Sequence, residues 1–149
     1  LWGVGDIAFY SVTGGRANHW PGFKFPVYSA VYPRLDKAYF GSTGSYLESL
    51  WGGIRFGLAG TLTCYDLDLV NQDKCVAATA SAFEPEIMIM GTSRPNDYKY
   101  KKITGASRGD VFYGIDFLND DIGYVVGSKG KIFYTHDGGN KWLQSSQSF

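Results

Sequence analysis

Oxygen-bearing side chains gather near the middle of the chain. Asp66 and Asp68 alternate with leucines, and Asn71 and Asp73 follow them. Carboxylate and amide oxygens at such spacing are the ligands that Ca²⁺ takes in proteins. The stretch lacks the glycine and the closing glutamate of an EF-hand loop, so a solvated polar loop is the alternative interpretation, and we favour it. We therefore assign no metal ligands.

Two cysteines flank this stretch. Cys64 and Cys75 are eleven positions apart, and the connection between them is polar, with the character of a hairpin. A disulfide that closes so short a loop stabilises a domain by about 3 kcal/mol in the chain-entropy description. We expect the two cysteines to pair, which implies an oxidising, extracytoplasmic compartment, and two buried free thiols are the alternative. A zinc site is disfavoured because His19 and His136 lack the paired spacing that such sites use.

A second cluster mixes cations with aromatic rings. Residues 98–102 read Tyr-Lys-Tyr-Lys-Lys, a mixture that nucleic-acid-binding patches also use. Alternation along a strand places the tyrosines on one face and Lys99 and Lys101 on the other, so we favour an ordinary exposed strand. The whole chain carries 14 basic and 14 acidic residues, so its formal net charge is zero. This balance gives no electrostatic reason to expect nucleic acid or an anionic membrane as the main partner.

The composition favours short strands joined by tight turns. Glycine accounts for 20 of 149 residues and aromatic residues for 17%, whereas glycine usually makes up about 7% of a protein. The longest uncharged stretches run only ten residues, too few for a helix that spans a bilayer. No long window shows helical periodicity. With 44% hydrophobic residues, the chain is also no candidate for disorder, and we predict an all-β fold.

The C-terminal forty residues predict one antiparallel meander. Short apolar runs cover residues 111–119, 122–126 and 131–136, and a fourth begins at Trp142. Turn residues (Asn, Asp, Gly) separate these runs, which is the pattern of consecutive strands joined by hairpins.

This meander recurs along the chain. A shift of 124 positions places Gly3 on Gly127, and a shift of 86 places Gly41 on Gly127. A fainter copy, shifted by 36, begins at residues 87–91 and places Gly91 on Gly127, so the turn glycines are spaced 38, 50 and 36 residues apart. Four strands at a period near forty are typical of β-propeller blades. We place the stretch between the two cysteines in the longest interval, as a connection from one blade to the next.

One turn of the meander resembles a known motif. Residues 135–142 read Thr-His-Asp-Gly-Gly-Asn-Lys-Trp and resemble the Asp-box, or bacterial neuraminidase repeat, at Thr135, Asp137, Gly139 and Trp142. The wider pattern over residues 117–142 is most similar to the propellers of the photosystem II stability and assembly factor family. Two further copies of the box are degenerate, with Thr13 and Trp51 in place of the aspartate and Asn18 and Phe56 in place of the tryptophan.

The Asp-box residues have a structural explanation. A carboxylate just inside a tight turn accepts hydrogen bonds from turn amides that otherwise have no partner. Glycines follow because those positions need unusual backbone angles, and the tryptophan covers the turn. We therefore expect Asp137 and Trp142 to stabilise the fold rather than to take part in catalysis.

Sialidases share this box, so an active site has to be considered. A sialidase resemblance implies an arginine cluster that holds a carboxylate, a Tyr–Glu nucleophile pair and an acidic proton donor. None of the arginines and glutamates of this chain lies in a matching motif: Arg16, Arg34, Arg55, Arg94, Arg108, Glu48, Glu84 and Glu86. We assign no catalytic residue and no cofactor, and we predict that the protein is not an enzyme.

These observations predict a single β-propeller domain over residues 1–149. We expect about four blades of four-stranded antiparallel meanders, near residues 1–25, 26–66, 75–107 and 108–149. The first blade is incomplete, and a missing innermost strand leaves an open sheet edge, which proteins avoid. We therefore expect the chain to be part of a larger propeller.

The predicted function is that of a non-catalytic scaffold that binds another protein. The family resemblance implies a role in the assembly or stabilisation of a photosynthetic membrane complex, in the thylakoid lumen. The alternative is a secreted carbohydrate-binding or sialidase-like protein. In that case Trp2, Trp20 and Trp51 are the candidates for stacking on sugar rings.

Overall fold

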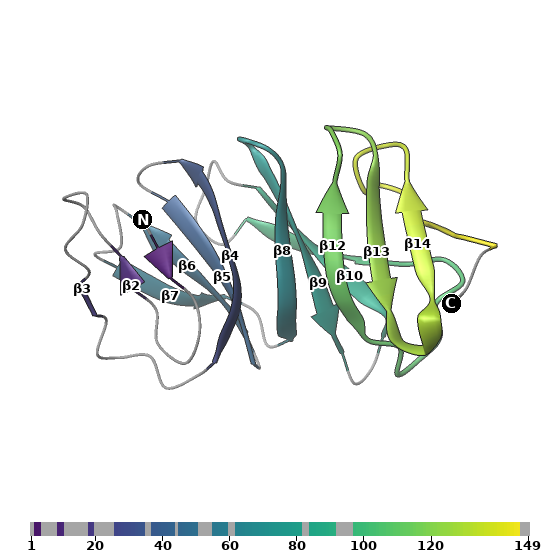
Figure 1. Cartoon of the computed structure of the whole chain (residues 1–149), viewed down its shortest axis with the longest axis horizontal. Coiled ribbons are helices and arrows are strands. Elements are labelled where there is room, and N and C mark those ends of the chain that lie inside the picture. Colours follow the sequence, from purple (N-terminus) through teal and green to yellow (C-terminus); the bar gives the residue numbers. More distant parts are fainter. Residues whose placement is uncertain are drawn as a thin grey trace.

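The structure is a computed structural model of the chain (Figure 1). It describes residues 2–3, 9–10, 18–19, 26–34, 37–43, 45–50, 55–59, 62–81, 84–91 and 97–146. Within these ranges the regular elements are strands, apart from one 3-10 turn at Ser128–Gly130. None of the described helical segments is long and apolar enough to cross a membrane.

The described strands form four sheets that follow one another along the chain. The first sheet contains β1 (Trp2–Gly3), β2 (Phe9–Tyr10) and β3 (Asn18–His19). The second contains β4 (Val27–Arg34), β5 (Lys37–Ser42), β6 (Ser45–Leu50) and β7 (Arg55–Ala59). The third contains β8 (Thr63–Asn71), β9 (Lys74–Ala80), β10 (Glu86–Gly91) and β11 (Tyr98–Lys102). The fourth contains β12 (Phe112–Phe117), β13 (Gly123–Gly127), β14 (Ile132–Thr135) and β15 (Leu143–Gln144).

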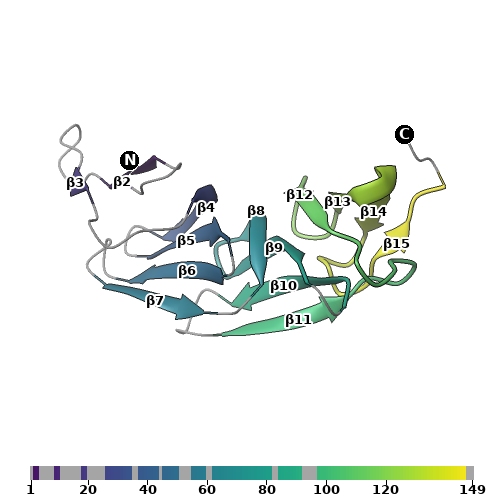
Figure 2. The same ribbon diagram turned by 90° about the horizontal axis from the view of Figure 1, so that it is seen from below.

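Each sheet is a meander in which every strand pairs antiparallel with the next one along the chain. The first strands of three successive sheets contact one another, β4 with β8 and β8 with β12. Figure 2 shows these strands along one side of the molecule and the last strands β7 and β11 along the other. Four sheets of this kind, the first with three strands, confirm the predicted fold class.

Apolar side chains fill the space between neighbouring sheets. The alternation along β13 turns Val125 toward the third sheet and leaves Tyr124 and Val126 exposed. One core cluster joins the third and fourth sheets, chiefly through Val76, Ala78, Ile87, Ile89, Phe112, Ile115, Val125, Phe133 and Trp142. A second cluster contains Tyr39, Cys64, Leu67, Cys75, Ala77, Met88 and Met90. Burial of each large apolar side chain contributes about 1.5–3 kcal/mol.

The third sheet corrects two expectations. Residues 64–75 do not connect two blades, because β8 and β9 form a hairpin within one sheet. Their Asp-Leu-Asp-Leu alternation, interpreted as a polar loop, is the period-two pattern of a strand. Gly91 ends β10, the third strand of its sheet, whereas Gly41 and Gly127 lie in second strands. The fainter repeat copy was therefore displaced by one strand.

The predicted disulfide is not formed. Cys64 and Cys75 are both free and fully buried. In the β8–β9 ladder Cys64 lies opposite Thr79, and Cys75 lies opposite Leu69. The two cysteines are thus separated by about 13 Å along the strands, at ~3.3 Å per residue, and a disulfide requires Cα atoms within about 7 Å. Burial raises the pKa of both thiols, so they pack as small apolar groups and give no support to an oxidising compartment.

Candidate functional site

The residues that resemble the Asp-box lie in the turn between β14 and β15. Thr135 Oγ1 accepts a hydrogen bond from the Gly139 amide at 2.9 Å and donates one to Asp137 Oδ1 at 2.9 Å. The same carboxylate oxygen accepts the Lys141 amide at 2.8 Å, which lowers the pKa of Asp137. Trp142 covers the turn, with its indole N–H donating to the Gly139 carbonyl at 3.1 Å. In this arrangement the polar groups of the motif bond to the turn itself.

The turn between β14 and β15 also contacts the third sheet. Gly138 and Gly139 have φ angles of +65° and +84°, a region that glycine occupies without strain. A side chain at Gly138 would place its Cβ atom 2.7 Å from the Asp120 carbonyl oxygen. Lys74 Nζ, from the start of β9, donates to the Gly138 carbonyl oxygen, and burial lowers the pKa of this lysine. These residues thus close the turn and anchor the fourth sheet on the third.

Asp66 and Asp68, the candidates for a cation site, instead bond to the neighbouring sheet. Asp66 Oδ2 accepts the Ile115 amide at 3.1 Å, and Asp68 Oδ2 accepts the Phe117 amide at 2.6 Å. Both amides belong to β12, which is the first strand of its sheet and has no partner on that side among the described strands. The aspartates therefore supply acceptors for an edge whose amides need partners.

The other members of the predicted cation group have different partners. Asn71 Nδ2 donates to Asp120 Oδ2 at 3.2 Å, and Asp73 forms an ion pair with Arg34 at 2.8 Å. Within the described residues, no three His, Cys, Asp or Glu side chains gather as a metal site does. The polar side chains of residues 66–73 therefore connect neighbouring sheets.

Substitution of Asp68 tests whether its carboxylate stabilises the fold as a hydrogen-bond acceptor or through its negative charge. Asp68→Ala leaves the Phe117 amide without its acceptor and is expected to lower the free energy of unfolding by about 1–3 kcal/mol. Asp68→Asn keeps a carbonyl oxygen and is expected to be neutral within ~0.5 kcal/mol, since burial disfavours the charged form and raises the pKa of Asp68. Urea denaturation of both variants measures the difference. Equal losses in the two variants would contradict the acceptor role.

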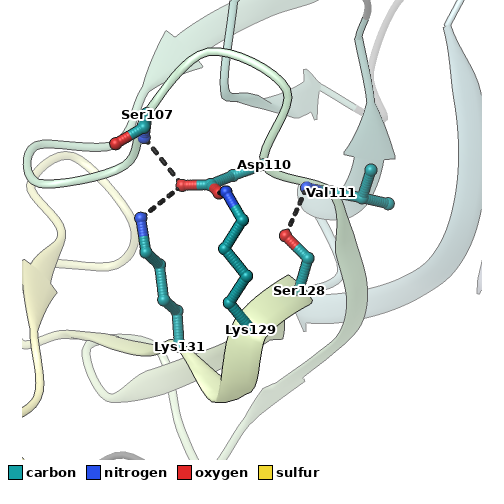
Figure 3. A network of polar contacts seen from close by, with 6 residues as sticks. All are labelled: Ser107, Asp110, Val111, Ser128, Lys129 and Lys131. Atoms are coloured by element: carbon teal, nitrogen blue, oxygen red, sulfur yellow. Dashed lines mark hydrogen bonds and ion pairs between the residues drawn. The ribbon is translucent and has the colours of Figure 1, made fainter.

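A buried carboxylate organises the start of the fourth sheet (Figure 3). Asp110 is 1% exposed, and its Oδ2 atom lies 2.5 Å from Lys131 Nζ, while its Oδ1 atom lies 3.1 Å from Lys129 Nζ. Oδ2 also accepts the Ser107 amide at 2.7 Å. Burial alone would raise the pKa of Asp110, but these hydrogen bonds outweigh it and hold the pKa well below its usual range. The result is a fixed negative charge that joins the connection before β12 to the β13–β14 hairpin.

A row of tyrosines crosses the starts of the three contacting strands. In β4, β8 and β12 the ladder with the next strand is interrupted at the same place by one extra residue, and this residue is Tyr28, Tyr65 and Tyr113 in turn. The ring centroids of Tyr28 and Tyr65 are 5.5 Å apart, and those of Tyr65 and Tyr113 are 5.3 Å apart. Tyr28 and Tyr113 are 44% and 53% exposed. β-Bulges of this kind re-aim a side chain, and here they bring three rings from three sheets into contact.

Neither the tyrosine row nor Asp110 was predicted from the sequence. Each tyrosine follows a buried residue and precedes a small or polar one, in the triplets Val-Tyr-Ser, Cys-Tyr-Asp and Phe-Tyr-Gly. These triplets coincide when the first strands of the sheets are aligned with one another, and not when the turn glycines are aligned. For Asp110 no local motif exists, because its lysine partners come from a hairpin about twenty residues further on.

Comparison with protein-family models and with curated protein sequences finds no match. Solved structures do match in their fold. YCF48 from Cyanidioschyzon merolae aligns with 94% of this chain and 53% of its own, with a TM-score of 0.65 and 8% sequence identity. An ancestral GH74 enzyme aligns with 97% of this chain and 23% of its own, with a TM-score of 0.70 and 12% identity. The chain therefore spans about half the length of the first structure and a quarter of the second.

The fold is a β-propeller. Its blades are the four sheets, and β4, β8 and β12 are the innermost strands of the second, third and fourth blades. The tyrosine row thus lies where the chain enters three successive blades. At sequence identities near 10%, the likeness to the two solved structures shows the architecture alone. It assigns no activity to this propeller.

The residues considered for a sialidase site have other positions. Arg34 is paired with Asp73, and Glu84 forms an exposed ion pair with Lys102 at 3.0 Å. Arg108 is exposed in the connection before β12. Other candidates for the sialidase site, for sugar stacking and for the degenerate box copies lie outside the described residues or belong to strands described by their backbone alone: Trp2, Thr13, Arg16, Asn18, Trp20, Glu48, Trp51, Arg55, Phe56 and Arg94.

Proposed function

We propose that this protein is a non-catalytic β-propeller scaffold that binds another protein. The observation that carries the proposal is the row of Tyr28, Tyr65 and Tyr113 at the entry of three blades, in which the two outer rings are exposed and Tyr65 is half-buried between them. Tyrosine is enriched at protein interfaces, since it offers a large, rigid and amphipathic contact area at a small cost in conformational entropy. The carboxylates of Asp66 and Asp110 are occupied by backbone amides and lysines, which suits structural roles better than proton transfer.

We further propose that the partner is a subunit of a photosynthetic membrane complex, and that the protein acts in its assembly or stabilisation within the thylakoid lumen. Two observations support this proposal. Residues 117–142 resemble the photosystem II stability and assembly factor family, and the blade arrangement is similar to that of YCF48. Neither observation depends on a disulfide between Cys64 and Cys75.

Binding to solubilised photosystem II assembly complexes tests the proposal. The tagged chain is expected to co-migrate with these complexes on native gels, and Tyr113→Ala is expected to weaken the association. Tyr124→Ala is the matched control, because Tyr124 is similarly exposed (48%) on the same blade but is not part of the row. Failure of the parent chain to associate with any such complex would contradict the assembly role.

The alternative is a secreted carbohydrate-binding or sialidase-like protein. The Asp-box resemblance favours it, and the fold of the ancestral GH74 enzyme is compatible with it. Binding of the parent chain to a glycan array, or hydrolysis of sialosides, in the absence of binding to photosynthetic complexes would establish this alternative instead.

A further inference from the structure

We infer that the outer face of the fourth blade binds the first blade of a second copy of this chain, so that two copies close one ring of blades. This inference goes beyond the proposed function and does not depend on it. The outer face is the side of the fourth sheet that is turned away from the third blade, and its apolar residues are Leu118, Tyr124, Val126, Ile132 and Tyr134.

The third and fourth blades correspond residue by residue. The correspondence is fixed by the bulged residues of their first strands, Tyr65 and Tyr113, and by the ladders that follow these bulges. It gives five pairs of residues on the same side of the two blades: Val70 and Leu118, Val76 and Tyr124, Ala78 and Val126, Ile87 and Ile132, and Ile89 and Tyr134.

These five positions are buried in the third blade and open in the fourth. The third-blade residues are at most 6% exposed, and all five belong to the core cluster that joins the third blade to the fourth. In the fourth blade Leu118 is 75% exposed, Tyr124 48% and Val126 46%, while Ile132 and Tyr134 are half-buried. A repeat at the end of a stack needs a polar outer face to remain soluble, whereas this face is apolar and marks an interface.

The second blade shows what covers such a face. Tyr39 lies two residues from Gly41 in β5 and has the same register position as Tyr124 has in β13. Tyr39 is only 1% exposed, because it packs into the cluster that the third blade supplies through Leu67 and Met88. The same residue type at the same position is thus buried wherever another blade follows, so the occupant that fits the outer face is a further blade.

The shape and the length of the chain favour a second copy as the source of that blade. The four sheets follow an arc, with the first and the fourth sheets at its two ends (Figure 2). The chain spans about half the length of YCF48, so two copies together have the length of one such propeller. A head-to-tail contact that closes after two copies gives a ring with two-fold symmetry. This ring covers the outer face of the fourth blade in both copies.

The first blade has a suitable residue at the contacting position. The shift of 124 that places Gly3 on Gly127 also places Phe9 on Phe133. Phe133 is fully buried in the cluster through which the fourth blade packs on the third. Phe9 belongs to β2, the middle strand of the first sheet. An aromatic residue therefore occupies the register position by which a blade contacts the outer face of its neighbour.

Light scattering coupled to size-exclusion chromatography tests the inference on the full chain. We expect a mass of twice the 16.4 kDa of one chain. Tyr124→Glu and Val126→Glu each place a charge in the outer face, and each is expected to raise the Kd of self-association by more than about thirtyfold, because the buried charge has no partner. Tyr100→Glu is the matched control, since Tyr100 is an exposed tyrosine on the outermost strand of the third blade, and it should dimerise as the parent does.

Photocrosslinking identifies the blade that covers the face. A benzophenone side chain in place of Tyr124 is expected to form links, in the band of twice the chain mass, to residues 1–25 of the other copy. Links to residues 111–146 of the other copy would instead show two fourth blades packed face to face. That result, a parent chain that is monomeric, larger open assemblies, or a dimer that both glutamate variants leave unchanged would each overturn the inference.

Two further measurements keep these outcomes interpretable. Circular dichroism checks that each glutamate variant keeps the fold of the parent. The association with photosynthetic complexes is tested with Tyr113→Ala, which changes an innermost strand and leaves the outer face intact. Loss of the dimer in Tyr124→Glu and loss of partner binding in Tyr113→Ala are therefore separate results, and either proposal can fail while the other stands.

Discussion

Trp142→Ala is expected to lower the free energy of unfolding by about 3–5 kcal/mol, as other buried aromatic truncations do. Trp142 is 2% exposed, and its ring packs edge-to-face against Phe117 at a centroid distance of 5.9 Å. It also belongs to the core cluster between the third and fourth blades, so its loss opens a cavity at a blade interface. Thermal denaturation should show a melting temperature lower by about 10 °C, at ~2–4 °C per kcal/mol for a chain of this size.

Two milder variants separate the contributions to this effect. Trp142→Phe keeps a buried ring but loses the N–H group that bonds to the Gly139 carbonyl, and it should retain more than half of the stability that Trp142→Ala loses. Asp137→Ala removes an exposed acceptor and should cost about 1 kcal/mol. If Trp142→Ala unfolds at the temperature of the parent, the turn between β14 and β15 is not packed as described.

The blade architecture was predictable because its signals are local. Tight turns need glycine, asparagine and aspartate at fixed places, and these residues recur in the sequence at the period of a blade. In the fourth blade every turn follows this chemistry, so all four of its strands were expected near their observed positions. In the third blade β9 contains no glycine, whereas β5 contains Gly41 and β13 contains Gly127, both close to the bulge of the preceding strand. The nearest glycine that matches the repeat is therefore Gly91, which lies in the next strand, β10.

Contacts between blades were not predictable in the same way. Asp66 and Asp68 resemble cation ligands when read along the chain, since nothing local indicates that amides of β12 lie opposite them. The cysteines illustrate the same limit. Their even number and short separation favoured a disulfide, but the register of the β8–β9 hairpin holds them too far apart. Spacing along the chain determines turns, whereas register and packing determine which side chains meet.

Asp110→Asn is expected to lower the free energy of unfolding at pH 7 by about 2–4 kcal/mol, because removing one member of a buried ion pair leaves the other without its counter-charge. Lys131 is the affected partner, since its side chain is 19% exposed and lies 2.5 Å from the carboxylate. Lys129, at 66% exposure, regains water more readily. Urea denaturation of parent and variant measures the loss, and Asp116→Asn, an exposed carboxylate in β12, is the control.

The loss in Asp110→Asn should depend on pH in one direction. The pKa of Asp110 is lowered in the folded state, so its contribution to stability is fully present above the ordinary aspartate pKa of about 3.9. Below that value the unfolded chain takes up a proton that the folded protein refuses, and the contribution shrinks as the pH falls toward the folded pKa. The parent should therefore approach the variant in stability between pH 4 and about pH 2, while the two differ by a constant amount from pH 5 to 8. A deficit in the variant that stays the same at every pH would mean that the carboxylate acts through its shape and not through its charge.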